Sequence, residues 1–179
     1  MLVTGIDPGT ATGAAACLSL TAGSIALEAL FSWRDMRGQC EALSLFAAHI
    51  ALSTDEHTDG LYAQCEGVFL QVKGARVDKL TGALACERSA GAWEMACTSS
   101  GVVWCARPLW TQWCGVMTGS TDADTVSALL PLAIKTRRVQ DLPKVLSCHQ
   151  LDAIALALYR IDLINNGYKF SELASKKGR

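Results

Sequence analysis

The sequence predicts one mixed α/β domain, in which helices flank a central sheet of five strands. Three short apolar segments open the chain at residues 2–6, 13–20 and 24–31, and turn residues separate the second segment from the third. This pattern is typical of an antiparallel meander. We expect two later strands to extend the meander in parallel. With 179 residues, of which 50% are hydrophobic, the chain can bury a substantial core.

The first predicted helix follows the meander at residues 38–52, where apolar side chains recur at helical spacing. Polar residues 53–59 end this helix. Residues 61–65 then predict the fourth strand, which presents Glu66 at its end. If the fourth strand lies beside the first, Glu66 will lie near the polar residue that ends the first strand.

The second half of the chain predicts further helices and a fifth strand. Residues 76–98 carry apolar side chains on one side, as a helix does, and residues 102–105 predict the fifth strand. We expect residues 122–138 to form a helix that is disturbed near Pro131, since a proline inside a helix costs about 3 kcal/mol. Two short helices are the alternative for this segment.

The last predicted helix, at residues 147–164, has the clearest signals. Ser147 and Gln150 form a capping box at its start, and Asn165-Asn166-Gly167 provide a stop signal. No internal repeat, low-complexity linker or second domain is visible in the sequence. We therefore expect residues 1–179 to form a single domain with a basic tail from about residue 168.

Charge is unevenly distributed along a chain whose formal net charge is only −1. Residues 1–65 contain two basic residues (Lys or Arg) and seven acidic ones (Asp or Glu). Residues 66–179 contain fourteen basic and ten acidic residues. Bulk charge alone therefore does not indicate a polyanion partner, and the C-terminal part is the basic one.

Eight cysteines would suggest disulfides in a small secreted domain, but none are spaced as CxxC. We expect them to be reduced, mostly buried thiols in a cytoplasmic protein without a signal peptide. The three histidines do not pair with cysteines at zinc-finger spacing. No apolar run approaches the roughly 20 residues that cross a bilayer, so we expect no membrane partner.

Four polar side chains stand out because each lies at the end of an apolar element. Asp7 ends the first strand before the Pro8-Gly9 turn, and Glu66 ends the fourth strand. His149 and Asp152 are three residues apart, so they project from one face of the last helix. Taken singly, Asp7 can be a turn former, and the helical pair can be caps near the helix dipole.

Taken together, these four residues predict a metal site. Converging carboxylates repel one another and have raised pKa values, so such clusters persist mainly when divalent cations neutralise them. Magnesium prefers oxygen ligands and retains waters. Two such ions about 4 Å apart can activate a water and stabilise the leaving oxygen in phosphodiester cleavage. The imidazole nitrogen of His149 is a ligand that manganese also accepts.

Three segments together form a recognisable pattern: GIDPGTATG at residues 5–13, CEGVF at residues 65–69 with its continuation to residue 83, and HQLDAIALA at residues 149–157. In order and spacing they resemble the RuvC family of Holliday junction resolvases. The likeness extends across about residues 2–160, which is nearly the whole chain. The stretch from Trp104 to Trp113 resembles divergent, phage-type members of the family, and buried core tryptophans are the favoured alternative for it.

The resemblance implies a ribonuclease H-like fold and a homodimer that cleaves four-way DNA junctions with Mg²⁺ or Mn²⁺. We therefore expect a crossover junction endodeoxyribonuclease that acts on Holliday junctions or related branched DNA. Its setting would be the cytoplasm, or the host cytoplasm if a phage encodes it. The implied catalytic residues and metal ligands are Asp7, Glu66, His149 and Asp152. Many family members carry a second Asp where His149 stands.

The resemblance also implies DNA-binding residues near Glu66. Phe69 stands where the family places an aromatic side chain near the junction centre, and stacking on an unpaired base is worth about 1–3 kcal/mol. The alternative for Phe69 is a core position. Basic side chains on the following loop and helix start suit phosphate contacts, with a solvated helix face as the alternative. They are Lys73, Arg76 and Lys79.

A further basic set follows a segment that departs from the family pattern. Asp122 and Asp124 lie where the family commonly presents a lysine-bearing turn toward DNA, and acids there repel phosphate. We expect basic side chains on the following helix to compensate. They are Lys135, Arg137 and Arg138.

Three other functions are alternatives to a junction-cleaving nuclease. Ribosomal-RNA-processing nucleases share the fold and a GIDPG-like start, but they are typically shorter and lack the Glu-x-Val-Phe continuation. A non-catalytic module that binds DNA junctions is a second alternative. The presence of all three acids of the predicted site, Asp7, Glu66 and Asp152, argues against it. A sugar-kinase or actin-like ATPase needs two such domains, which 179 residues cannot supply.

Overall fold

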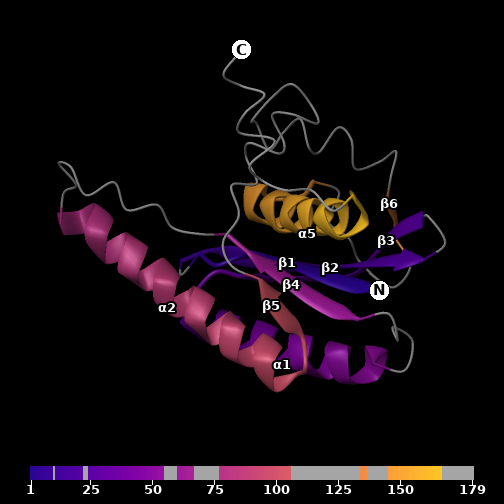
Figure 1. The fold of residues 1–179 in the computed structure, drawn as a ribbon. Helices are drawn as coiled ribbons and strands as arrows, with labels where there is room; N and C mark the ends of the chain where they lie inside the picture. Colours follow the sequence, from indigo (N-terminus) through magenta and orange to yellow (C-terminus); the bar gives the residue numbers. More distant parts are fainter. Residues whose placement is uncertain are drawn as a thin grey trace, which may run out of the picture.

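In the computed structural model, the chain forms a six-stranded mixed sheet with helices on both faces (Figure 1). The structure describes residues 1–9, 11–21, 24–54, 60–66, 77–105, 134–136 and 145–166. The elements are β1 (Leu2–Asp7), β2 (Gly13–Thr21), β3 (Ser24–Trp33), α1 (Met36–Ser53), β4 (Leu61–Cys65), α2 (Val77–Ser99), β5 (Val103–Cys105), β6 (Ile134–Thr136) and α5 (Cys148–Asn166). The strand order across the sheet is β5-β4-β1-β2-β3-β6.

The pairing of the strands confirms the predicted fold class. β1 pairs with β2 and β2 with β3, both antiparallel, and the second pairing runs to Thr21 opposite Ser24. On the other side of β1, β4 and then β5 extend the sheet as parallel strands. β1 is therefore a central strand, with an antiparallel neighbour on one side and a parallel neighbour on the other.

One short strand contradicts the sequence-based prediction. The apolar spacing predicts a helix at residues 122–138, but Ile134–Thr136 form β6, which pairs in parallel with residues 25–27 of β3. Pairing with a strand from the start of the chain overrides the local helical pattern here. Lys135 therefore lies on a strand at the sheet edge and not on a helix. The rest of the predicted helix lies outside the described residues.

The two faces of β1 pack against different helices. Side chains alternate along a strand, so Leu2 and Ile6 join the core beneath α1 and α2, whereas Val3 joins the core beneath α5. Asp7 follows Ile6 and thus has the orientation of Val3. The alternation therefore directs the one carboxylate of β1 to the face that α5 covers.

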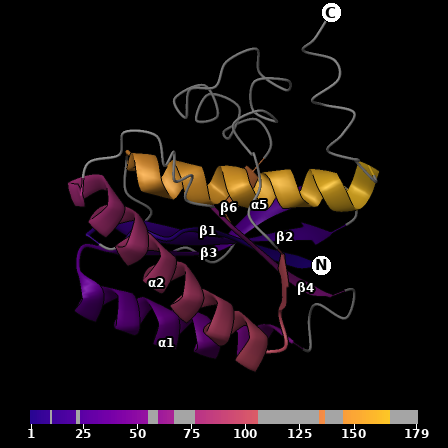
Figure 2. The ribbon, with the colours of Figure 1, turned by 60° about the vertical axis from the view of Figure 1, so that its left-hand side comes forward.

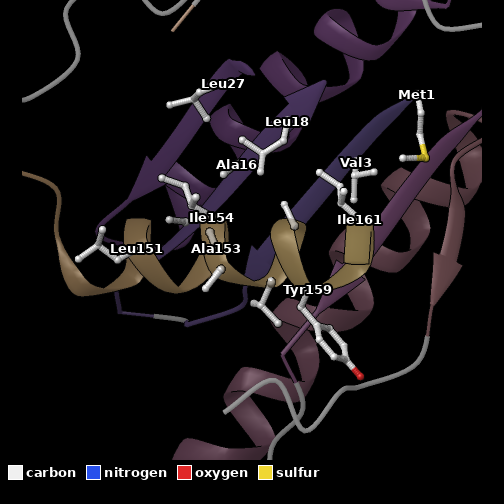
Figure 3. Packing of buried hydrophobic residues seen from close by; sticks show 14 residues of the cluster. Met1, Val3, Ala16, Leu18, Leu27, Leu151, Ala153, Ile154, Tyr159 and Ile161 are labelled. Atoms are coloured by element: carbon white, nitrogen blue, oxygen red, sulfur yellow. The ribbon is translucent and has the colours of Figure 1, made fainter. Parts of the chain in front are cut away.

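α5 lies directly on β1 and β2, and small residues make this close approach possible. A Cβ atom added at Gly5 would overlap the backbone carbonyl of Ala153 and lie 2.5 Å from the backbone nitrogen of Ala157. Val3 and Ala16 of the sheet lie in one buried cluster with residues of α5 (Figure 3). Only glycine fits at position 5 without moving the helix, so this residue determines how near the start of α5 lies to the end of β1.

α1 and α2 cover the opposite face of the sheet (Figure 2). Trp93 of α2 stacks on Trp33 of β3 with ring centroids 5.3 Å apart, and Phe46 of α1 meets Trp93 edge-on. At the start of α1, the Asp35 side chain accepts a hydrogen bond from the backbone N–H of Gly38 at 2.7 Å. These aromatic contacts hold the end of β3 and the helices of this face together.

The structure bears on two further expectations. The six cysteines whose side chains it describes are free thiols, and those at positions 17, 65 and 97 are buried. Burial raises the pKa of the Cys17 thiol to about 12. Within the described ranges, no helix is both long and apolar enough to cross a membrane.

Candidate active site

Asp7 and Glu66 lie beside each other at one edge of the sheet. β1 and β4 are parallel neighbours with Ile6 opposite Cys65, and the backbone N–H of Glu66 donates to the Ile6 carbonyl at 2.9 Å. The Glu66 side chain also interacts with Asp7 and acts to lower the Asp7 pKa. The pairing of β1 with β4 therefore brings two carboxyl groups to one edge of the sheet.

The start of α5 is fixed by the capping box that the sequence predicts. The backbone N–H of Ser147 donates to Gln150 Oε1 at 2.9 Å, and the backbone N–H of Gln150 donates to Ser147 Oγ at 3.3 Å. This reciprocal cap leaves His149 and Asp152 without a capping role. Both side chains are thus free to serve a site at the end of β1.

His149 connects the last helix to the first strand. Its Nδ1 atom lies 2.5 Å from Asp7 Oδ2, and its Nε2 atom lies 2.7 Å from the hydroxyl oxygen of Thr12. Thr12 lies in the turn between β1 and β2, and no local pattern predicts this contact. Its position in the GIDPGTATG segment, which forms the turn after Asp7, is the sequence feature that could have indicated a role near the site. Both ring nitrogens of His149 therefore have partners, which fix the ring at the edge of the site.

Asp152 is the least satisfied acid of the group. Its Oδ1 atom is buried and has no hydrogen-bond partner in the described part of the chain. Burial, and then the nearby charge of Asp7, raises the pKa of Asp152 to about 6, although His149 opposes the shift. A buried oxygen without a donor costs free energy unless something occupies it, so it marks a place for a ligand.

The pKa of Asp7 is also raised above its ordinary value. Burial is the main cause, and hydrogen bonds with His149 and Glu66 act in the opposite direction. Only 10% of the Asp7 side chain is exposed. The protein thus holds at least two carboxyl groups, Asp7 and Asp152, in surroundings that disfavour their charge, an arrangement that is common at functional sites.

The chemistry of these side chains fits a hard divalent cation. Asp7 interacts with Glu66, His149 and Asp152 at this edge of the sheet, and a cation would be held by their oxygen and nitrogen atoms, including the unpaired oxygen of Asp152. In the described residues, however, no three His, Cys, Asp or Glu side chains already surround a common point. Hydrogen bonds within the group hold Asp7 and His149 together instead. Binding would therefore exchange these hydrogen bonds for metal ligation.

The predicted DNA-binding side chains lie outside what the structure describes. Five of them belong to undescribed segments near Glu66 or after β6, and two others have a described backbone only. The first group is Phe69, Lys73 and Arg76, together with Arg137 and Arg138; the second is Lys79 in α2 and Lys135 in β6.

The order of the strands and the position of α5 on the sheet define a ribonuclease H-like fold. Two solved structures are similar to it: "T. thermophilus RuvC in complex with Holliday junction substrate", with a TM-score of 0.60 and 17% identity, and "Thermus thermophilus RuvC structure", with 0.56 and 18%. Each match covers 93% of this chain and 97% of the other. The resemblance to RuvC is thus confirmed for the fold. No family model matches the sequence, and the search of curated proteins gives no match.

Proposed function

We propose that the chain is a divalent-metal-dependent endonuclease that cleaves four-way junctions or related branched DNA, in recombination or repair. One observation carries this proposal: Asp7 of β1 interacts with Glu66 of β4 and with His149 and Asp152 of α5, and an oxygen of Asp152 is buried there without a partner among the described residues. The likeness in fold to a RuvC that was solved with a Holliday junction supports branched DNA as the substrate.

The metal-binding residues in this proposal are Asp7, Glu66, His149 and Asp152. Mg²⁺ is the expected ion, and Mn²⁺ should replace it, since carboxylate oxygens suit both. When bound, two such ions lower the pKa of a water and stabilise the leaving oxygen of a phosphodiester. Asp7 interacts with both His149 and Glu66, so it would be the central ligand of the group.

The chain's own side chains then have distinct tasks. Glu66 and Asp152 each hold one side of the site and orient the attacking water. His149 either completes the second set of ligands or moves a proton, and Thr12 keeps its ring in place. Attack on the phosphorus from the side opposite the 3′ oxygen leaves products with 5′-phosphate and 3′-hydroxyl ends.

Residues beyond the catalytic group complete the proposal. Phe69 would stack on an unpaired base, and the basic side chains named above would contact phosphates. A homodimer would place two such sites on one junction. Leu84 and Met95 of α2 support this, because both are exposed, at 50% and 68%, and lie about three helical turns apart on one side. We expect a single domain over residues 1–179 that acts in the cytoplasm, or in the host's if a phage encodes it.

A substrate panel tests the proposal directly. The purified protein should be incubated with a synthetic four-way junction, a flap, a splayed arm and an RNA–DNA hybrid, each with Mg²⁺, Mn²⁺ or EDTA. We expect nicking of the four-way junction with either metal and none with EDTA. Preference for structured RNA would favour the ribosomal-RNA-processing alternative, and tight junction binding without nicking would favour the non-catalytic one.

The Asp7→Asn variant is the control for contaminating nucleases. It should bind the junction and lose cutting by more than the roughly 10–100-fold that loss of an outer-shell partner of a metal costs, because Asp7 is proposed to touch the metal itself. Undiminished cutting by this variant would contradict the assignment.

A further inference from the structure

A groove of about 1150 Å³ opens beside the candidate active site, and the proposed chemistry does not use it. Its walls come from the start of β2, the end of β3, the first turns of α1 and the segment that enters α5. We call it the Arg34 groove. Besides Arg34, its walls include Thr12, Trp33, Arg37, Ser147 and His149. Thr12 and His149 belong to both the groove and the active site, so the two are continuous.

The size of the groove favours an extended ligand. Pockets that enclose small molecules usually measure about 300–1,000 Å³. The Arg34 groove exceeds this range and lies between separate elements of the fold. A chain that runs through the groove into the active site therefore fits better than a compact molecule.

Two arginines give the groove contacts for an anion. Arg34 and Arg37 are the only Lys or Arg in residues 1–65, against seven Asp or Glu, and both lie in this groove. Arg34 is exposed and has no ion-pair or hydrogen-bond partner in the described part of the chain. Arg37 pairs with Glu41 at 3.3 Å, but the two side chains are 89% and 65% exposed. Such exposed pairs contribute little, so Arg37 can exchange Glu41 for a phosphate.

The groove also contains two acids, Asp35 and Glu41, so its formal charge is zero and the arginines would act as local phosphate contacts. The Asp35 carboxylate is occupied at the start of α1, where it accepts the N–H of Gly38. α5 also begins at the groove, and the partial positive charge of two helix N-termini adds to that of the arginines. Arg34 is thus a cation without a partner in the described residues, whereas Asp35 already has one.

The wall of the groove is rigid. The indole N–H of Trp33 donates to the carbonyl of Gly9 at 2.7 Å, and the side chain is only 3% exposed. A Cβ atom added at Gly13 would overlap the Trp33 ring, so this turn packs tightly against it. A preformed wall lowers the entropic cost of binding an extended strand.

We propose that the Arg34 groove binds the sugar–phosphate backbone of the DNA strand that is cut, on one side of the scissile phosphate, with Arg34 and Arg37 at its phosphates. This inference rests on the proposed function, because it assumes that His149 lies at the cutting site. The groove gives the strand a path to the active site.

The first test measures the salt dependence of junction binding in the non-cutting Asp7→Asn protein. Arg34→Gln and Arg37→Gln should each weaken binding and lower the slope of log Kd against log salt by about 1. Two substitutions that each remove a negative charge serve as controls, one inside the groove and one outside it. Glu41→Gln, in the groove, should tighten binding, whereas Glu94→Gln, exposed on α2 and outside the groove, should leave it unchanged.

The second test locates the contact on the DNA. Single phosphates on either side of the cut position are replaced by neutral methylphosphonates. The parent protein should lose affinity at one or two of these positions, and the Arg34→Gln, Arg37→Gln double variant should show no further loss at the same positions. This absence of additivity is the signature of a direct contact.

The outcomes separate the groove from the proposed function. If the wild-type protein cuts junctions but the arginine variants keep their affinity and salt slope, the groove proposal is wrong and the function stands. If the wild-type protein binds junctions and never cuts them, the function is wrong, and the slopes still decide the groove. If Glu94→Gln changes binding as much as Glu41→Gln does, the effect is not local and the groove proposal fails. Absence of any DNA binding overturns both.

Discussion

His149 Nδ1 lies 2.5 Å from Asp7 Oδ2, although 142 positions separate the two residues in the chain. The contact joins the first turn of α5 to the last residue of β1, and it depends on the close packing of α5 over Gly5. The Asp7 side chain is 10% exposed and that of His149 35%. The acid is therefore enclosed, whereas the imidazole reaches solvent.

Thr12 should control the efficiency of the site through His149. Thr12→Val keeps the shape of the side chain but removes the hydroxyl that lies 2.7 Å from His149 Nε2. Partners that orient a metal ligand are worth about 10–100-fold in metal affinity or activity, and we expect a loss in this range. The measurement is the Mn²⁺ concentration that gives half-maximal junction cutting. Thr12→Ser, which retains the hydroxyl, should behave as wild type, and equal defects in both variants would exclude this role.

Asp152 should make the metal-free protein less stable as the pH rises. Its pKa is about 6 in the folded state against an ordinary value of 3.8, so the unfolded chain ionises first. Stability is full below about pH 4 and falls as the pH rises through 6. Asp152→Asn removes this dependence. After allowance for solvent screening, it should stabilise the protein by about 1 kcal/mol at pH 7.5, or about 2–4 °C in Tm.

The control for Asp152 is the same comparison at low pH. Thermal unfolding in EDTA should give nearly equal Tm values for wild type and Asp152→Asn at pH 4, where the carboxyl is neutral in both states. A constant difference between the two proteins from pH 4 to pH 7.5 would show that the carboxyl is not held in unfavourable surroundings.

Local signals in the sequence were sufficient for most of the fold, whereas the four proposed ligands stay a prediction. The turn after Asp7 and the cap at Ser147 depend on near neighbours, so their positions follow from short segments. β6 depends on pairing with residues 25–27, and local spacing at residues 122–138 favoured a helix instead. The contact of Thr12 with His149 also depends on tertiary packing. Such long-range relationships are absent from local patterns.

Gly5 should be among the positions least tolerant of a side chain. The added Cβ of Gly5→Ala would overlap the backbone of α5 at Ala153, which cannot move aside as a flexible side chain can. Overpacking of this kind costs about 1–3 kcal/mol, and we expect the upper end, or roughly 6–12 °C in Tm. Gly82→Ala on α2 is the matched control, since no atom lies within 4 Å of its added Cβ. It should be neutral or stabilising by about 0.5–1 kcal/mol, and a similar loss in both variants would contradict the close contact at Gly5.

Divalent metal should reverse the pH dependence of stability. Ligation needs ionised carboxylates, so Mn²⁺ should bind weakly at pH 5, where Asp152 is largely protonated, and more tightly at pH 7.5. At a concentration 100 times its Kd, a ligand of the folded state stabilises by about 2.7 kcal/mol, which corresponds to roughly 5–10 °C for a chain of this size. Thermal unfolding with and without Mn²⁺ should therefore show a shift of this order at pH 7.5 and a much smaller one at pH 5. Asp7→Asn should lose the shift at both pH values, and an equal shift in that variant would place the bound Mn²⁺ elsewhere on the protein.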